Sequence, residues 1–244
     1  MSLRKTTAPL HSGAVIGTIH SPASLKAAQK LKKGAVDFLE LRVDAFSESD
    51  SLLAQLKKAA PGLLAPLVVT VRDPKEGGVN ALSAVRRRAL LREFFEYASL
   101  IDVELRSTGK KSGFSELLGE ARERGIGLIF SHHDFRTTPP LERLQELAAR
   151  AGEAGATVFK VATMAKTASA FSTLLEFLAL HSEGREKPGM KLAVMGMGEF
   201  GKISRLALGS AGSVLNYGYL HKPQVSGQWP AELLKDRLRE LAKA

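Results

Sequence analysis

The sequence predicts a single (β/α)₈ barrel, an α/β fold in which eight parallel strands alternate with eight helices. Three observations lead to this fold class. Short apolar runs of β-type composition recur roughly every 20 to 35 residues, segments of helical period lie between them, and no linker or low-complexity stretch divides the 244 residues. Single α/β barrels are commonly this size. A doubly wound open sheet is the alternative fold.

Eight runs are expected to be strands, because each has the composition and length of a strand buried on both faces. They span residues 15–20, 38–44, 67–72, 100–105, 128–133, 157–163, 192–197 and 214–220. We expect one catalytic domain over residues 1–244. Residues 1–13 then form an N-terminal extension of the barrel, and a cloning remnant at its start is one interpretation.

The segments between these runs carry apolar residues at helical spacing. The apolar faces are formed by Leu82, Val85 and Ala89, by Leu141, Leu144, Ala148 and Ala151, by Phe171, Leu174, Leu175 and Leu178, and by Leu234, Leu238 and Leu241. Proline marks three expected helix starts, at Pro22, Pro140 and Pro230. Glycines mark expected helix ends before strands, at Gly34, Gly125 and Gly155.

Composition narrows the function classes. Lys and Arg number 35 against 25 Asp and Glu, a net charge of +10, which suits an anionic small substrate. The basic residues are scattered and lack an aromatic platform, so we expect no nucleic-acid partner. The absence of cysteine excludes disulfides, thiolate metal sites and cysteine nucleophiles. Neither a signal pattern nor a long apolar run is found, so we expect a soluble cytoplasmic protein without membrane contact.

Lys160 interrupts the apolar run of residues 157–163. A solitary buried ammonium is costly, so this side chain has two interpretations. It can lie at a strand end and extend to solvent. Alternatively, it is a Schiff-base nucleophile whose pKa is lowered by burial and nearby cations. Other polar residues also fall at or near the ends of predicted strands, where barrel enzymes carry their active sites, and this favours the nucleophile.

The second and third strands supply charged candidates. Glu40, Arg42 and Asp44 alternate and are expected to share one strand face, either as groups that pair with each other and with a ligand or as a structural Glu–Arg pair. Arg72 ends the third run and can bind a hydroxyl or a carboxylate. Glu76 follows in a charged, glycine-containing loop and can orient a base, although a solvated surface loop would look similar.

His132 and His133 end the fifth run. Adjacent strand residues point to opposite faces, so these two are not expected to chelate one metal, and no other cluster completes a zinc site. We therefore predict no metal site. One of the two histidines is a candidate proton shuttle, because imidazole titrates near neutral pH.

Residues 196–201 match the pattern G-x-G-x-x-G. A dinucleotide interpretation is weak, because the motif follows the seventh strand and no acidic residue lies about 20 positions further on. In a barrel, these glycines would instead let backbone amides approach an anionic ligand. Arg205 follows and can pair with a carboxylate. Residues 224–228 suit a loop that covers a ligand, or an ordinary turn.

Taken together, these stretches resemble type I 3-dehydroquinate dehydratase. The matching motifs occur in the family's order at residues 40–44, 72–78, 133–135, 159–162, 201–206 and 226–228. The resemblance implies a barrel enzyme of the shikimate pathway that converts 3-dehydroquinate to 3-dehydroshikimate and water. It implies that neither a metal nor an organic cofactor is needed, and that a homodimer is a possible assembly.

The resemblance also implies residue roles. Lys160 would form the imine, His133 would move the protons and Glu76 would orient His133. Substrate-binding positions are implied for the remaining matched residues: Thr18, Glu40, Arg42, Arg72, Arg205, Gln224 and Gln228. The chain departs from the family at Gln224, where serine is usual. Either glutamine substitutes as a donor or the loop closes differently.

Three other functions stay open on the residues alone. A class I aldolase also uses a Schiff-base lysine in a barrel, but it gives no reason for pairing His133 with Glu76. A nicotinamide-dependent dehydrogenase would need the glycine motif to bind a dinucleotide. A non-catalytic binding barrel would need an unreactive Lys160.

Overall fold

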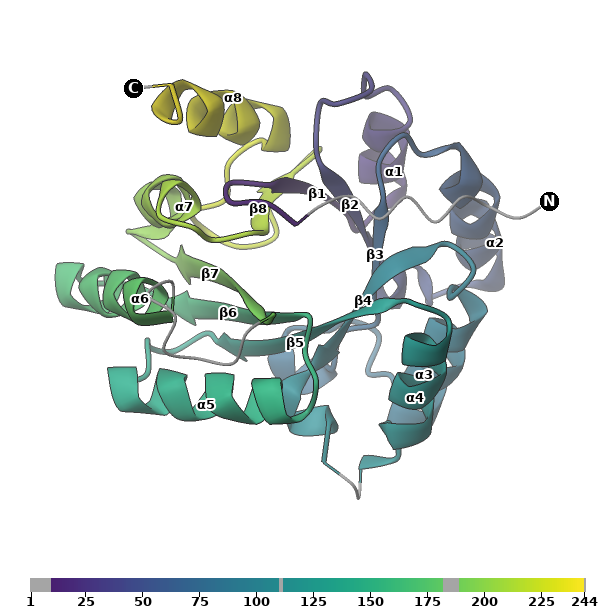
Figure 1. The fold of residues 1–244 in the computed structure, drawn as a ribbon. Coiled ribbons are helices and arrows are strands. Elements are labelled where there is room, and N and C mark those ends of the chain that lie inside the picture. The colour runs from purple at the N-terminus through teal and green to yellow at the C-terminus, as the bar shows by residue number, and fades with distance from the viewer. Residues whose placement is uncertain (1–9, 110–111, 182–188, 244) are drawn as a thin grey trace.

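A computed structural model describes residues 10–109, 112–181 and 189–243. Figure 1 shows strands gathered at the centre of the molecule and helices around the outside. The strands are β1 (Val15–Ile19), β2 (Phe38–Arg42), β3 (Leu67–Thr70), β4 (Ala98–Glu104), β5 (Gly127–Asp134), β6 (Val158–Met164), β7 (Lys191–Met197) and β8 (Asn216–Tyr219). Each predicted run overlaps one of these strands, with ends shifted by up to two residues.

The eight strands form one parallel sheet in the order β7-β6-β5-β4-β3-β2-β1-β8. The two edges of this sheet, β7 and β8, approach each other. The backbone amide of Val214, just before β8, donates to the carbonyl of Leu192 in β7 at 2.9 Å. The sheet is therefore a nearly closed barrel, as predicted, and the open doubly wound sheet is excluded. Residues 1–9 of the expected N-terminal extension lie outside the described residues. Just before β1, the backbone amide of Gly13 donates a hydrogen bond to the carbonyl of Ser213.

Each strand is followed by a helix that covers the outside of the barrel. The helices are α1 (Pro22–Ala28), α2 (Asp50–Ala59), α3 (Ala84–Glu93), α4 (Ser115–Glu123), α5 (Leu141–Glu153), α6 (Ala168–Leu180), α7 (Gly201–Ser210) and α8 (Ala231–Leu241). Proline opens α1 at its first position, and Ser21 caps that helix by accepting a hydrogen bond from the amide of Ser24. Gly125 and Gly155 follow α4 and α5 with positive φ angles, as expected of helix-terminating glycines.

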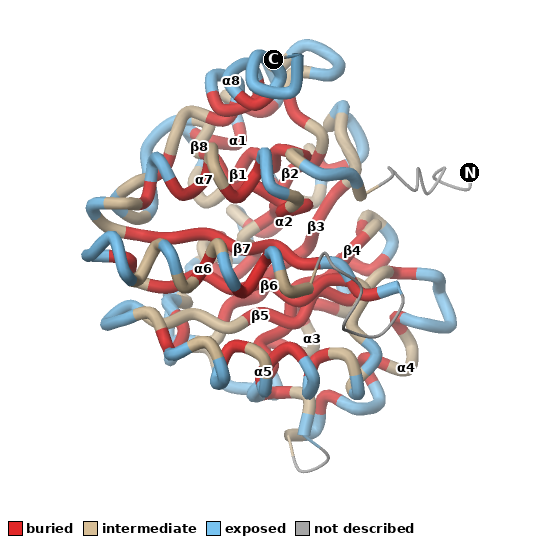
Figure 2. The backbone as a smooth tube through the Cα atoms, turned by 60° about the vertical axis from the view of Figure 1, so that its left-hand side comes forward, coloured by how far each residue is buried: buried red, intermediate tan, exposed pale blue. Residues whose placement is uncertain are grey.

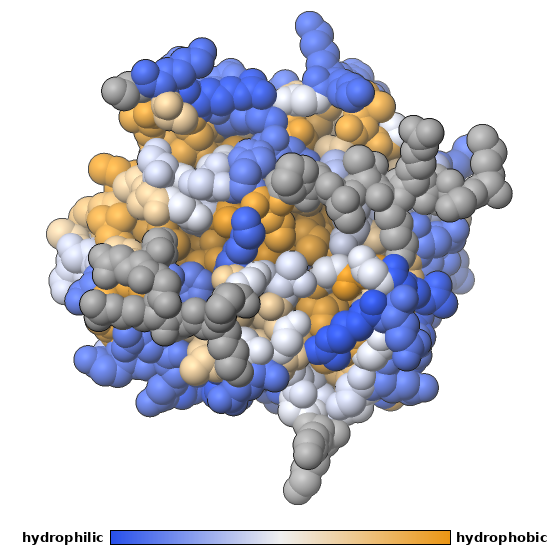
Figure 3. Space-filling view, in the orientation of Figure 1, coloured by the Kyte–Doolittle hydropathy of each residue, from blue (hydrophilic) through white to orange (hydrophobic). Residues whose placement is uncertain are grey.

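The hydrophobic core has two parts. Most buried apolar residues lie between the strands and the helices, where each helix turns one buried face inward (Figure 2). A second cluster fills the inside of the barrel and includes Ile16, Phe38, Leu100, Ile129 and Val158. On the face seen in Figure 3, hydrophilic residues lie mainly around the edge and hydrophobic ones gather towards the middle and left. Among the described residues, none of the helices has the length and apolarity that crossing a membrane requires.

Candidate active site

A cavity of about 490 Å³ opens at the carboxyl ends of the strands. All ten predicted site residues line it: Thr18, Glu40, Arg42, Arg72, Glu76, His133, Lys160, Arg205, Gln224 and Gln228. They come from strands β1, β2, β5 and β6, from helix α7 and from the loops that follow β3 and β8. The topology brings them together because parallel strands of a barrel deliver their carboxyl ends to one face.

Lys160 lies in the middle of β6 and points into the barrel, where its residue is 3% exposed. Its Nζ donates to Asp102 Oδ2 at 2.8 Å and lies 4.1 Å from the centre of the Tyr217 ring. Burial lowers the pKa of Lys160, the Arg72 cation lowers it further, and Asp102 opposes both. The interpretation in which this lysine extends to solvent is therefore wrong.

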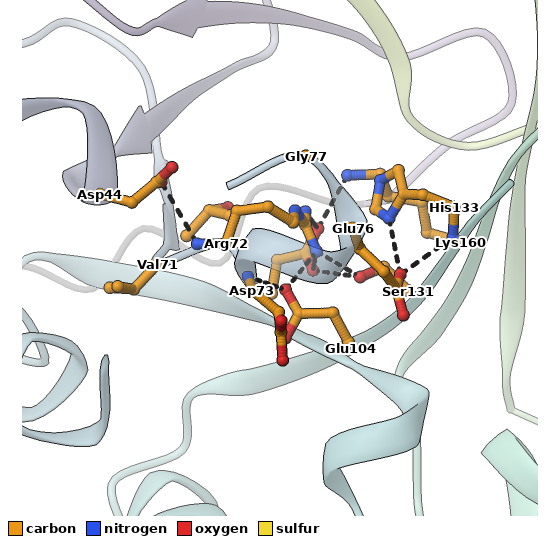
Figure 4. Close-up of polar contacts among 12 residues, drawn as sticks. Asp44, Val71, Arg72, Asp73, Glu76, Gly77, Glu104, Ser131, His133 and Lys160 are labelled. Atoms are coloured by element: carbon orange, nitrogen blue, oxygen red, sulfur yellow. Dashed lines mark hydrogen bonds and ion pairs between the residues drawn. The ribbon is translucent and has the colours of Figure 1, made fainter. Parts of the chain in front are cut away.

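Arg72 holds the carboxylates around the lysine (Figure 4). Its two terminal nitrogens bind both oxygens of Asp102, at 2.9 and 2.8 Å, and one of them also binds Glu104 at 2.9 Å. Ser131 completes the cluster by donating to Asp102 at 2.6 Å. Burial alone would raise the pKa of Asp102, but Arg72 and Lys160 lower it well below its usual range. Asp102 is therefore an ionised acceptor that fixes the position of Lys160 Nζ.

His133 and Glu76 form the predicted pair. Glu76 Oε2 accepts hydrogen bonds from both the backbone amide and the Nδ1 of His133, at 3.0 and 3.1 Å. With Nδ1 assigned as the protonated nitrogen, Nε2 is left as a proton acceptor. Burial lowers the pKa of His133 well below its ordinary value, and the cations of Arg72 and Lys160 act in the same direction. The ring is therefore a neutral imidazole at neutral pH.

The carboxyl group of Glu76 is itself buried, at 7% exposed. Burial, and then the charge of Glu104, raises the pKa of Glu76 to about 7, while Arg72 opposes the rise. As predicted, His132, which is adjacent to His133, lies outside the cavity lining.

The charged residues of β2 follow the sequence prediction only in part. Glu40 and Arg42 face the cavity, and Glu40 accepts a hydrogen bond from Thr70 at 2.8 Å. The expectation that Asp44 shares their strand face is wrong, because β2 ends at Arg42 and a 3₁₀ turn over Val43–Phe46 follows. Asp44 turns back and binds Arg42 through both oxygens, at 3.0 and 2.8 Å. The ion pair of Arg42 is thus with Asp44 rather than with Glu40, and it fixes Arg42 at the cavity wall.

Arg205 projects from α7 and is 1% exposed. Its guanidinium group donates to four backbone carbonyls: those of Gly196 at 2.8 Å, Gly201 at 2.8 Å, Gly227 at 2.7 Å and Tyr217 at 3.2 Å. Among the described residues, no carboxylate forms an ion pair with Arg205. Burial lowers the pKa of Arg205 to about 10, still far above neutral. A buried cation without a counter-charge is a site for an anion.

The glycine motif supports Arg205 rather than a ligand. The amides of Gly196, Gly198 and Gly201 are bonded within the chain, to Ser204 Oγ and to the carbonyls of Ser226 and Gly198. These three amides are therefore engaged within the chain. The missing side chain matters at Gly201 instead, since a Cβ there would lie 2.7 Å from the Gly227 Cα. This close approach joins the start of α7 to the loop after β8.

That loop closes one side of the cavity. Gln228 is buried, and its Oε1 accepts from the backbone amide of Gln224 at 2.6 Å. Its amide nitrogen is left to donate into the cavity. Gln224 lines the rim with an exposed side chain. Its backbone thus helps position Gln228, whatever its own side chain binds.

The sequence interpretation missed three residues that shape the site. Asp102 and Glu104 hold Arg72 and lie on β4, where two acidic residues alternate inside an apolar run. That spacing could have indicated their role, because acidic residues buried on one strand face need cationic or hydrogen-bonding partners. Tyr217 covers Lys160 from β8 and gave no signal, since an aromatic residue in a strand is typical of a core.

The fold and the position of the cavity define a (β/α)₈-barrel enzyme with a lysine at the centre of its site. Among the described residues, no group of three or more His, Cys, Asp or Glu side chains is arranged to hold a metal ion. The family model of type I 3-dehydroquinase matches residues 18–244. The chain therefore belongs to the type I 3-dehydroquinase family, and its activity is that of a hydro-lyase, a 3-dehydroquinate dehydratase of the shikimate pathway.

Individual relatives agree with this membership. The 3-dehydroquinate dehydratase of Latilactobacillus sakei is 32% identical over 210 residues, covering 85% of this chain and 84% of its own. The enzyme of the same name from Thermococcus gammatolerans is 31% identical, with 92% and 97% covered. Among solved structures, the type I 3-dehydroquinate dehydratase of Clostridium difficile with covalently modified comenic acid superposes with a TM-score of 0.83, at 28% identity and with 95% and 92% covered.

Proposed function

We propose that the chain dehydrates 3-dehydroquinate through a Schiff base on Lys160. The observation that carries the proposal is the placement of Nζ: it is buried, aimed into the cavity and held by Asp102 at 2.8 Å. Burial and Arg72 lower its pKa, which increases the neutral fraction that can attack a ketone. The amine adds to the ketone carbon, and loss of water from the adduct leaves a cationic imine.

The imine makes the next step possible. A proton beside a ketone is too weakly acidic for an imidazole alone, but a protonated imine accepts the electron pair and holds it as an enamine. We assign proton removal to the Nε2 of His133. The enamine then expels the β-hydroxyl, which takes a proton from the imidazolium of His133 and leaves as water. Hydrolysis of the imine returns Lys160 and releases the conjugated product.

Glu76 supports His133 in this scheme. Its carboxyl group accepts from Nδ1 at 3.1 Å and from the backbone amide of the same residue, which fixes the ring and leaves Nε2 as the acceptor. The imidazolium that forms during the reaction gains an adjacent negative charge whenever Glu76 is ionised. We propose Glu76 as an orienting group, with no direct contact to substrate.

The remaining cavity residues are proposed to bind the substrate. Arg205 is suited to the carboxylate, because it is a buried cation that only neutral carbonyls contact in the described chain. Glu40 and Arg42 are suited to hydroxyl groups, with Thr18 and Gln228 beside them. Arg72 is bonded to Asp102 and Glu104, so we propose that it mainly holds these carboxylates and contributes positive potential to the cavity.

The His133→Ala variant tests the assignment of steps. Wild type should convert 3-dehydroquinate to a product with the ultraviolet absorbance of a conjugated ketone, and His133→Ala should lower kcat by about 10²- to 10⁴-fold. The variant should nevertheless form the imine, so borohydride and substrate should leave a reduced adduct seen by intact mass. Normal turnover by the variant, or turnover by wild type without any adduct, would contradict the scheme. Release of a smaller carbon fragment would favour an aldolase.

Assembly and location also belong to the proposal. We propose a homodimer acting in the cytoplasm, on the basis of the family resemblance and of a composition without cysteine. Light scattering after size exclusion would test the dimer against the 26.2 kDa chain mass. Fractionation of cells that make the native protein would test the location.

A further inference from the structure

Three buried polar atoms along one wall of the cavity make no hydrogen bond within the described chain. They are Thr18 Oγ1, His20 Nδ1 and the hydroxyl of Tyr217. The wall is built by β1 and β8, which are paired so that Ile16 lies beside Tyr217. Buried polar groups are almost always hydrogen-bonded, so their concentration here points to a ligand that supplies the partners.

Tyr217 is the most informative of the three. It is 5% exposed, and its ring centre lies 4.1 Å from Lys160 Nζ. The face of an aromatic ring attracts a cation, so the ring favours the ammonium and would equally favour a cationic imine on the same nitrogen. The ring therefore has a use in the site that phenylalanine could also supply.

The hydroxyl needs a separate explanation. The nearby carboxylates have other donors: Glu40 accepts from Thr70, and Asp102 accepts from Arg72, Ser131 and Lys160. A phenol buried without a partner costs stability that phenylalanine would avoid. Packing alone would thus favour phenylalanine at this position, and the hydroxyl is best explained by a contact made when the cavity is occupied.

We propose that Tyr217 is a further substrate-positioning residue: its hydroxyl donates a hydrogen bond to an oxygen of a polyhydroxylated ligand held at Lys160, while its ring covers the lysine nitrogen. This deepens the proposed function and rests on it. A ligand that lacks this oxygen would leave the Tyr217 hydroxyl without an acceptor and would therefore bind more weakly. Tyr217 would therefore contribute to specificity as well as to affinity.

The Tyr217→Phe variant removes only the hydroxyl. We expect KM for 3-dehydroquinate to rise about two- to tenfold, the range for one hydrogen bond, with kcat nearly unchanged. The ligand-free variant should melt at the same temperature as wild type or higher, because an unpaired buried hydroxyl has been removed. This combination separates ligand binding from a structural role, which would lower the melting temperature and leave KM unchanged.

Two further variants complete the test. Tyr219→Phe is the matched control, because Tyr219 lies two residues further along β8 and does not line the cavity, and its KM should equal that of wild type. Tyr217→Leu also removes the ring, so kcat should fall below that of Tyr217→Phe. A Tyr217→Phe KM within twofold of wild type would overturn the role of the hydroxyl, and a Tyr217→Leu kcat equal to that of Tyr217→Phe would overturn the role of the ring.

Borohydride trapping separates this proposal from the one on which it rests. We expect wild type and Tyr217→Phe to give the same adduct mass at saturating 3-dehydroquinate. Failure of active wild type to form an adduct would contradict the Schiff base itself. An adduct in wild type together with an unchanged KM in Tyr217→Phe would contradict only the assignment of Tyr217.

Discussion

The two ends of the barrel interior differ in chemistry although the same strands build both. Moving two residues along one strand face changes an apolar side chain into a polar one. The pairs are Phe38 and Glu40, Leu100 and Asp102, Ile129 and Ser131, and Val158 and Lys160. The apolar members fill the amino-terminal half of the barrel, and the polar members surround the cavity at the carboxyl-terminal half.

The contrast shows how one fold can separate stability from chemistry. The apolar layer is close-packed and excludes water, so it stabilises the barrel and forms a dry base under the charges. Burial above that base is the leading influence that lowers the pKa values of Lys160 and His133 and raises that of Glu76. Substitutions in the apolar half should therefore lower stability, and those in the polar half should change the reaction or the way stability depends on pH.

Phe38→Ala should have the largest effect of the four substitutions, because it removes a large side chain from the apolar half of the barrel interior. Phe38 is 1% exposed inside the barrel, so its truncation should lower the free energy of unfolding by about 3–5 kcal/mol. Activity per folded molecule should be largely kept. Urea unfolding measures the loss, and Leu64→Ala, at a position 59% exposed, is the control, with an expected change of about 0.5 kcal/mol or less. An equal loss in both variants would contradict the packed layer.

Glu76→Gln should change how stability depends on pH. The pKa of Glu76 is raised from 4.5 to about 7, so the folded protein holds this proton more tightly than the unfolded chain does. Ionising the group therefore costs stability, by about 3 kcal/mol once the pH has risen from 4.5 to 7. Relative to wild type, Glu76→Gln should become more stable across this window.

The measurement for Glu76 is urea unfolding at a series of pH values, compared between the variant and wild type. Taking the difference reduces the contributions of groups that titrate alike in both proteins. Glu48→Gln, at an exposed position, is the control and should track wild type. Parallel curves for Glu76→Gln and wild type would contradict a raised pKa for Glu76.

Arg205→Lys tests whether a residue of the polar half contacts the substrate. Lysine keeps the charge but loses the planar donor group, so the loss of a charged hydrogen bond should raise KM about 10- to 100-fold. Steady-state kinetics on protein shown to be folded by circular dichroism gives the value. Arg136→Lys, at an exposed position after β5, is the control. A KM equal to wild type would contradict a carboxylate contact at Arg205.

Gln224→Ser should have the smallest effect. The Gln224 side chain is exposed at the rim, and its described hydrogen bond to Gln228 uses the backbone amide, which serine would keep. We expect kcat/KM to stay within about twofold of wild type, the size of a surface substitution. A loss of tenfold or more would mean that the glutamine side chain itself contacts substrate.

The fold was predictable because its signals are local. Eight apolar runs separated by helical segments suffice to specify alternating strands and helices, and each of the eight overlaps a strand of the barrel. The boundaries were less accurate: β2 ends at Arg42, so Asp44 leaves the strand face on which its alternation placed it. A turn that depends on contacts with Arg42 and Arg72 has no signal in the period of the strand.

The candidate site was predictable as a set of residues, and all ten line one cavity. The residues that hold these side chains in place were harder to predict. Asp102 binds Lys160 across 58 positions of sequence, and Arg72 joins strands β3, β4 and β5, so both contacts depend on register that composition does not encode. The contacts of the glycine motif depend on the fold in the same way. Its amides bond within the chain, and carbonyls of Gly196 and Gly201 hold Arg205.

The most direct test of the account is intact mass after borohydride treatment of wild type and Lys160→Ala, each with and without 3-dehydroquinate. We predict a substrate-dependent mass increase in wild type, mapped by peptide digestion to Lys160, and none in the variant, which should fold but have no measurable turnover. An adduct that persists in Lys160→Ala, or active wild type that never forms one, would contradict the central role of the buried lysine.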